Sequence, residues 1–163
     1  MTTLSKSTTT TPKSSAAAKD AIALLKADHG TVSELFADYE KTNSSSKKKA
    51  LVAEICTELS VHAQIEEEIF YPAVKAVLKD KLLVPEATVE HGGIKELIAQ
   101  LEGVEPDGAI YDAKVKVLSE YVEHHVKEEQ SEMFPKVKAT SLDLADLGAR
   151  MATRKADLLA ARG

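Results

Sequence analysis

The stretch HAQIEEEIFYP, from His62 to Pro72, decides the fold that this chain is predicted to adopt. His62 and Glu66 stand four residues apart, so on an α-helix they lie one turn apart on the same face. That face is otherwise apolar at helical spacing, with Ile55, Leu59 and Ile69. Because an unpaired polar side chain on a buried face is costly, the spacing indicates a chelating pair.

The same pattern returns at HVKEEQSEMFP, where Glu129 follows His125 by four residues and Pro135 follows it by ten. A second pair of segments also matches, DHGTVSELFADYE (28–40) and EHGGIKELIAQLE (90–102), with His29 and His91 at equivalent places. The repeat has a period of roughly 62 residues and predicts two similar helix pairs. Each pair supplies one histidine from its first helix, then a histidine and a glutamate from its second.

The composition predicts one globular domain. The chain has 163 residues, 44% of them hydrophobic, and a net charge of −5, which is enough to bury a core. The acidic balance and the 4% of aromatic residues favour neither nucleic acid nor an anionic membrane as a partner. A single cysteine, Cys56, excludes an internal disulfide framework and favours a reducing, cytoplasmic location. We expect it to be a packed thiol without a redox role.

The sequence divides into three parts. Residues 1–14 are Ser/Thr-rich and are expected to form a disordered tail, with an organelle transit peptide as the second interpretation. Residues 15–140 are expected to form a four-helix bundle, and residues 141–163 an amphipathic helix that covers it. No apolar run approaches the roughly 18 residues of a membrane span.

Four helices of up-down-up-down topology are predicted within the bundle, which makes the fold all-α. They cover about residues 15–41, 47–80 and 85–101, and then a segment that Asp107 caps and that continues past Met133. Ser15 is the predicted cap of the first helix, and Gly103 is expected to end the third. Pro72 and Pro135 should each kink a helix. Gly92 and Gly93, inside the third helix, indicate either close approach of another group or simple helix packing.

The predicted inward donors are His29, His62, Glu66, His91, His125 and Glu129. A lone histidine on an apolar face is usually a satisfied core residue, but six donors that recur in register favour metal binding. Six donors exceed the four of a structural zinc site and divide naturally between two metals. Imidazoles and carboxylates without thiolates are typical of non-haem iron. The Glu-x-x-His spacing of ferritin-like bundles is absent.

His124 competes with His125 for the fourth helix, because Glu128 also stands four residues after it. The repeat decides for His125, which precedes Pro135 by ten residues as His62 precedes Pro72. His124 is therefore expected outside the site. Three further glutamates, Glu67, Glu68 and Glu128, are expected to be exposed or to lie behind the ligands.

These six positions resemble the hemerythrin-like, HHE cation-binding family over about residues 17–138. The resemblance implies that His29 and His62 bind one iron, that His91 and His125 bind the other, and that Glu66 and Glu129 bridge them with an oxo or hydroxo group. The up-down-up-down bundle is a known architecture of this family.

Two positions depart from the oxygen-carrying hemerythrins, which have a histidine where this chain has Lys95 and an aspartate where it has Gln130. The pattern instead resembles the bacterial H-HxxxE-H-HxxxE subgroup. One histidine fewer implies open coordination positions, which favour chemistry with nitric oxide, peroxide or oxygen over reversible oxygen storage. Three tyrosines near the height of the ligands, Tyr39, Tyr71 and Tyr121, are expected at the edge of the core and not as ligands.

The sequence therefore predicts a protein with two non-haem iron ions that handles oxygen, nitric oxide or peroxide as a sensor, scavenger or protector of iron centres. The alternative is a non-catalytic module that stores metal or binds oxygen. The motifs leave open whether the protein is an enzyme, and they identify no protein partner.

Overall fold

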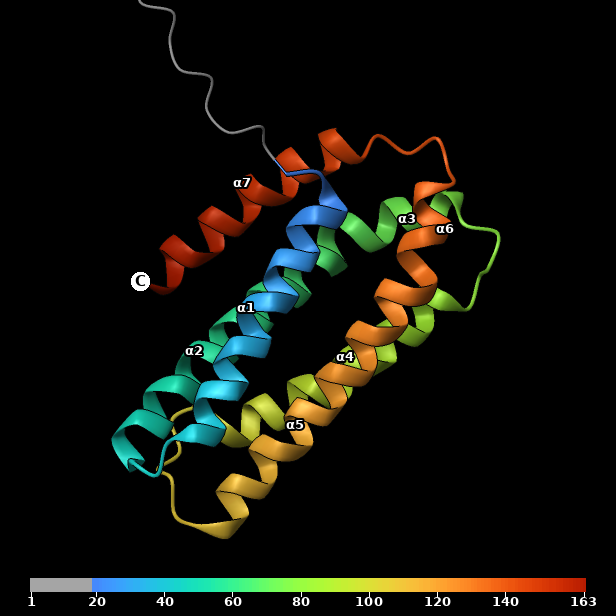
Figure 1. Ribbon diagram of the computed structural model, residues 1–163. Coiled ribbons are helices and arrows are strands. Elements are labelled where there is room, and N and C mark those ends of the chain that lie inside the picture. The colour runs from blue at the N-terminus through green and yellow to red at the C-terminus, as the bar shows by residue number, and fades with distance from the viewer. Residues whose placement is uncertain (1–18) are drawn as a thin grey trace, which may run out of the picture.

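The computed structural model describes residues 19–163, and within them the chain is all-helical (Figure 1). The helices are α1 (Ala21–Lys41), α2 (Ser45–Ile65), η1 (Glu66–Phe70), α3 (Tyr71–Val77), α4 (Leu83–Leu101), α5 (Ala109–Glu128), η2 (Glu129–Met133), α6 (Phe134–Lys138) and α7 (Leu144–Arg162). The segments α2, η1 and α3 continue one another, as do α5, η2 and α6. The predicted four-helix bundle with an additional C-terminal helix is confirmed. The predicted tail, residues 1–14, lies outside the described residues.

Helix ends follow the local chemistry of their caps. Asp20 caps α1 by accepting a hydrogen bond from the backbone N–H of Ala23 at 2.8 Å, whereas Ser15 lies outside the described residues. Gly103 follows α4 with φ 71°, as predicted for a helix stop. The prediction that Asp107 caps α5 is wrong, because Gly108 occupies the cap position with φ 103°, a conformation that favours glycine.

The two prolines act through π-helical turns. Proline has no N–H to donate and its ring clashes with the carbonyl four residues earlier, so the helix widens before it. The backbone N–H of Tyr71 reaches the carbonyl of Glu66, five residues back, and Pro72 then falls in the first turn of α3. The second repeat does the same at η2, just before Pro135. The predicted kinks therefore take the form of two matched π-turns.

The predicted metal donors lie between two apolar clusters. One cluster gathers around Phe70, Phe134 and Leu25 and includes residues of α7. The other surrounds Ile55 and Leu118. Because both clusters are densely apolar, the polar groups between them are shielded from solvent, and their charges act at low dielectric.

Helix α7 packs against α1, α2 and η1, on the side of the bundle away from α4 and α5 (Figure 1). Leu147 and Met151 are the buried side chains that it contributes. Gly148 permits close docking, because a Cβ there would stand 2.5 Å from the carbonyl oxygen of Lys19 and 2.7 Å from the backbone nitrogen of Ala21.

Gly148→Ala is therefore expected to displace α7 and to lower the free energy of unfolding by about 1–3 kcal/mol, the usual cost of overpacking. Gly92→Ala is the control, because a Cβ at Gly92 meets no atom within 4 Å. An alanine inside a helix should raise stability there by about 0.5–1 kcal/mol. Urea unfolding of both variants measures the difference, and equal effects would show that α7 is not closely docked at this glycine.

Cys56 is buried, and burial raises the pKa of its thiol to about 12, which fits the expected packed thiol. A Cβ at Gly93 would stand 3.6 Å from the ring of Tyr121, an ordinary contact, so an alanine would fit there and helix packing does not require this glycine. In the part of the chain that the structure describes, no helix combines the length and apolar character needed to cross a bilayer.

Candidate metal centre

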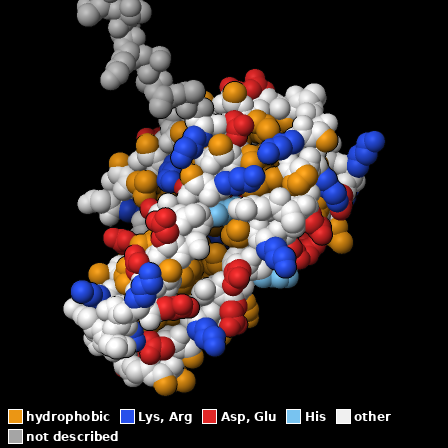
Figure 2. Space-filling view, in the orientation of Figure 1, with side chains coloured by type: hydrophobic (Ala, Val, Ile, Leu, Met, Phe, Trp, Pro, Cys, Tyr) orange, Lys and Arg blue, Asp and Glu red, His pale blue; other side chains and the backbone are white. Residues whose placement is uncertain are grey.

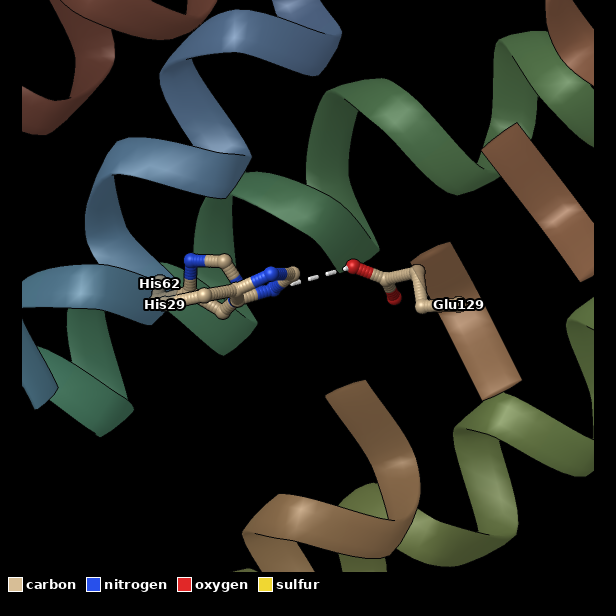
Figure 3. A group of neighbouring side chains, drawn as sticks. All are labelled: His29, His62 and Glu129. Atoms are coloured by element: carbon tan, nitrogen blue, oxygen red, sulfur yellow. Dashed lines mark ion pairs between the residues drawn. The ribbon is translucent and has the colours of Figure 1, made fainter. Parts of the chain in front are cut away.

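The structure brings all six predicted donors together in the middle of the bundle. They form two groups, and within each group the donor atoms lie within 4.8 Å of one another. The first group is His29, His62 and Glu129, and the second is Glu66, His91 and His125. Figure 3 shows the first group, with the carboxylate of Glu129 facing the two imidazoles of α1 and α2. Each group thus combines two histidines of one repeat with a glutamate.

Each glutamate contacts histidines of both repeats. Glu66 Oε1 lies 2.8 Å from His62 Nε2 and 3.5 Å from His91 Nε2. Glu129 places Oε1 at 3.3 Å from His29 Nε2 and Oε2 at 3.2 Å from His125 Nε2. This arrangement fits the bridging role predicted for both carboxylates.

Several of these donor atoms are buried without a hydrogen-bond partner. They are His29 Nε2, His62 Nε2, both carboxylate oxygens of Glu66, and Glu129 Oε1. The pair His62 Nε2 and Glu66 Oε1 is close, yet the two atoms do not point at each other as in a hydrogen bond, so their lone pairs remain available. Because orphaned polar atoms in a core are costly, the donor set fits metal ions: ligands about 2.1 Å from one ion and at right angles lie about 3 Å apart.

Three of the four imidazoles are fixed through Nδ1, which leaves Nε2 to face the centre. Asp28 Oδ2 lies 3.0 Å from His62 Nδ1, and Glu90 Oε1 lies 2.9 Å from His125 Nδ1. Gln130 Oε1 lies 2.9 Å from His29 Nδ1. Partners of this kind set the orientation and basicity of metal-binding histidines.

Sequence reasoning missed Asp28 and Glu90, although a signal was present. Each stands directly before the first histidine of its repeat, as Asp28–His29 and Glu90–His91. In the structure, each acid is hydrogen-bonded to the histidine on the second helix of its own repeat. Asp28 on α1 pairs with His62 on α2, and Glu90 on α4 pairs with His125 on α5.

The ionisable groups stabilise one another. Burial disfavours the charged imidazole of His62, but the carboxylates of Glu66 and Asp28 outweigh it and raise the pKa of His62 well above its usual value. Burial likewise opposes charge on His125, yet Glu129 and Glu90 raise its pKa to about 9. Metal ions must displace these protons, so metal binding here releases protons.

The register of the fourth helix is the one predicted. The side chain of His125 is 5% exposed, whereas that of His124 is 65% exposed. Glu68 is exposed and binds Arg154, and Glu67 binds Lys95 at 2.7 Å. These two glutamates therefore lie outside the donor set.

Tyr71 contradicts the expectation that the tyrosines lie at the edge of the core. It is buried, and its Oη donates a hydrogen bond to Glu129 Oε2 at 2.7 Å and lies 3.2 Å from His91 Nε2. Burial, together with Glu66 and Glu129, raises the pKa of Tyr71 well above its usual value, so the phenol is protonated. Tyr39 and Tyr121 lie elsewhere: Tyr39 binds Asp112 at 2.6 Å, and Tyr121 is exposed.

The equivalent of Tyr71 in the second repeat is Phe134, whose ring stacks on His29 with 6.1 Å between ring centroids. One half of the centre therefore meets a hydroxyl group and the other an aromatic hydrocarbon. Two ions bound here would have different surroundings.

Comparison with known proteins gives the family. The hemerythrin HHE cation-binding domain matches residues 20–137. The chain belongs to the hemerythrin HHE cation-binding family. A crystal structure of an HHE domain-containing protein from Mycobacterium kansasii, a homolog of Rv2633c, superposes with a TM-score of 0.75 at 27% identity. The match covers 88% of this chain and 89% of that one.

Two relatives are similar in sequence. The uncharacterized protein Rv2633c of Mycobacterium tuberculosis is 28% identical over 114 residues, 68% of this chain and 69% of that protein. A DNA nickase from Nostoc sp. is 27% identical over 115 residues, which is 71% of this chain but 32% of the nickase. This HHE chain therefore spans about a third of the length of that relative.

A small cavity lies against the donors of this HHE domain. It has a volume of about 30 Å³ and is lined by the four histidines together with apolar side chains such as Val32, Ile94 and Val126. A wider groove of about 550 Å³ runs along α1 and α5, and His29, Val32, Val122 and Val126 line both spaces. Figure 2 shows this face hollowed, with a histidine and hydrophobic side chains inside the hollow. The centre is thus approached from the groove between α1 and α5.

Helix α7 contacts the centre indirectly through Lys155. Its Nζ lies 2.5 Å from Asp28 Oδ1, while Asp28 Oδ2 holds His62. Burial opposes ionisation of Asp28, but the hydrogen bonds from His62 and Lys155 lower its pKa. Lys155 therefore positions His62 by keeping Asp28 charged and in place.

Lys155→Met is expected to weaken metal binding by about tenfold, the lower range for loss of a group behind a ligand, with Lys155→Arg restoring most of the affinity. Arg154→Met is the matched control, because it removes the neighbouring ion pair of α7 with Glu68 and leaves Asp28 untouched. Metal affinity is measured by competition with a chelator. Equal losses in Lys155→Met and Arg154→Met would assign the effect to docking of α7 alone.

Proposed function

We propose that this protein holds two non-haem iron ions and binds or reacts with oxygen, nitric oxide or peroxide, as a sensor, scavenger or protector of iron centres. The observation that carries the proposal is the pair of glutamates, each of which contacts histidines of both repeats. A single ion would use the ligands around one of these glutamates, whereas two ions account for the ligands around both. Donors limited to imidazole, carboxylate and phenol favour iron over thiolate-selecting metals.

The cavity limits the reacting molecule to a small one. A single water needs roughly 10–15 Å³ of such volume, so about 30 Å³ accommodates a diatomic molecule or peroxide and excludes larger substrates. Its lining is largely apolar, which favours weakly polar ligands such as oxygen and nitric oxide. Iron would supply the redox chemistry.

The protein's own residues would prepare that chemistry. Asp28 and Glu90 hold two imidazoles in place through Nδ1. Tyr71 holds a proton on Oη, directed at Glu129, and lies with Phe134 in one apolar cluster, away from the residues that line the cavity. The two apolar clusters exclude water from the donors.

The deciding experiment is metal analysis of protein purified from iron-replete cells, together with its near-ultraviolet absorption spectrum. Two irons per chain support the proposal, and one metal per chain or firmly bound zinc would refute it. Mixing the reduced protein with peroxide or with nitric oxide then tests reactivity. Rapid reaction that is lost in His91→Ala supports chemistry, whereas inertness toward both would favour the alternative, a storage or binding module.

Tyr71→Phe is expected to leave two metals bound, to change the absorption spectrum of the iron-loaded protein, and to lower its rate with peroxide by about a hundredfold, the low end of the range for a positioned proton donor. Tyr39→Phe is the matched control, since it also removes a hydroxyl bonded to a carboxylate, but away from the centre. Stopped-flow absorption measures both variants. If the two variants behave alike, Tyr71 has no role in the reaction.

A further inference from the structure

A third group of metal-binding side chains lies outside the centre, on the surface between α4 and α5. Glu90, His124 and Glu128 bring their donor atoms within 4.8 Å of one another. His124 Nε2 lies 3.3 Å from Glu90 Oε2 and 3.2 Å from Glu128 Oε1. We call these three residues the outer triad.

The first repeat has no such group at the equivalent place. Val61 and Ile65 stand where the second repeat has His124 and Glu128, and both are fully buried. Ile65 packs in the cluster that includes Leu147 and Met151 of α7. The same face of the second repeat is uncovered and carries donors in place of the apolar residues.

The charges of the two halves differ in the same way. The acid of the first repeat, Asp28, is neutralised on its outer oxygen by Lys155. In the second repeat the outer oxygen of Glu90 faces an imidazole and a second carboxylate. Among the described residues, no lysine or arginine lies within ion-pair distance of Glu90 or Glu128. Two carboxylates thus share one imidazole, an excess of negative charge that a divalent cation would balance.

The outer triad connects to the centre through Glu90. Its Oε1 lies 2.9 Å from Nδ1 of His125, while its Oε2 lies 3.3 Å from His124. A cavity of about 10 Å³, roughly the space of one water, is lined by Glu86, Glu90 and Glu128 and also by His125 and Glu129. Leu83, Ala87 and Met133 complete the lining. Carboxylates therefore lie along the short passage from the outer triad to Glu129, a predicted bridging ligand.

We propose that Glu90, His124 and Glu128 form an outer site for a divalent cation, from which metal passes to the centre along this acidic path. Binding is a ligand exchange in which the cation loses water and replaces any proton on His124, with no change of oxidation state. Metal would thus enter between α4 and α5, on a different route from the groove between α1 and α5. The delivery step rests on the proposed metal centre, whereas binding at the outer triad does not.

Calorimetric titration of the full-length, metal-loaded protein with Zn²⁺ tests the outer site. We expect one further ion per chain in the wild type, with affinity reduced by about tenfold or more in His124→Asn and in Glu128→Gln, because ligand number and charge set the affinity. Glu120→Gln is the control, since it removes one exposed acid of α5 outside the triad. No further ion in the wild type, or unchanged binding in His124→Asn, would overturn the proposal.

Iron uptake by the metal-free protein tests delivery. His124→Asn is expected to slow uptake of Fe²⁺ several-fold while the final content stays that of the wild type. Because His124 is exposed, this variant should fold normally, which circular dichroism checks. Unchanged uptake would overturn delivery. A centre that holds one ion or none would refute the proposed function, yet the zinc titration would still decide the outer site.

Discussion

Glu66→Ala and Glu129→Ala are each expected to lower the content of tightly held metal from two ions per chain toward one. Each carboxylate contacts histidines of both repeats, so its loss removes a shared ligand and brings two cations into a core with less negative charge. Unbalanced charge in a low-dielectric interior is strongly unfavourable. We expect the affinity for the second ion to fall by at least about a hundredfold, beyond the range for groups that only support a ligand.

Metal analysis after desalting measures this effect, because desalting removes weakly held surface ions. Glu68→Ala is the matched control: it removes a glutamate two residues from Glu66 that is exposed and bound to Arg154. We expect it to retain both ions. If Glu128→Ala stripped the centre while Glu129→Ala kept both ions, then His124 and not His125 would be the ligand.

Removal of metal by a chelator is expected to lower the melting temperature of the wild type by about 10–20 °C. Each ion present at a hundred times its dissociation constant stabilises the fold by about 2.7 kcal/mol, so two contribute about 5 kcal/mol. In a domain of this size, each kcal/mol shifts the melting temperature by about 2–4 °C. The metal-free core would also retain the buried carboxylates of Glu66 and Glu129 with unpartnered oxygens, which adds to the loss.

Differential scanning calorimetry with and without chelator measures the shift. Re-addition of Fe²⁺ should restore stability, whereas Mg²⁺ should not, because a hard cation that retains its waters fits imidazole donors poorly. The variant His29→Ala with His91→Ala loses a ligand from each group, and a chelator should scarcely change its melting temperature. An equal shift in that variant would show that the stabilising ion binds elsewhere.

The fold was predictable because hydrophobic spacing and the internal repeat agree. The apolar stripes that contain His29, His62, His91 and His125 fix which face of each helix is buried, and all six donors do converge. Pro72 and Pro135 correctly marked the breaks in their helices. Asp107 failed as a cap because Gly108, with its positive φ, takes that position.

Tyr71 was missed because the helix is not α-helical between it and Glu66. At 3.6 residues per turn, a residue five positions after Glu66 lies about 140° away from it around the helix. The π-turn widens this segment so that Tyr71 N–H bonds to the Glu66 carbonyl, and both side chains then reach the same centre. No periodicity based on the α-helix could place this tyrosine correctly.

Lys155 was missed for a different reason. Its contact with Asp28 joins residues 127 positions apart, and the amphipathic pattern of α7 predicts only that this helix covers the bundle. Which charged residue meets a buried acid depends on the docking angle of α7. That angle follows from close packing at Gly148, which sequence spacing does not reveal.

The chain packs chiefly within its two halves, α1 on α2 and α4 on α5, with fewer contacts between them. The donors, by contrast, reach across this division, since each glutamate touches histidines of both halves. Bound ions would therefore act as removable cross-links between two duplicated hairpins. If the ions are iron, as proposed, a cell short of iron would contain chains whose halves separate more readily and are cleaved sooner by proteases, and the abundance of this protein would follow the iron supply without any change in its synthesis.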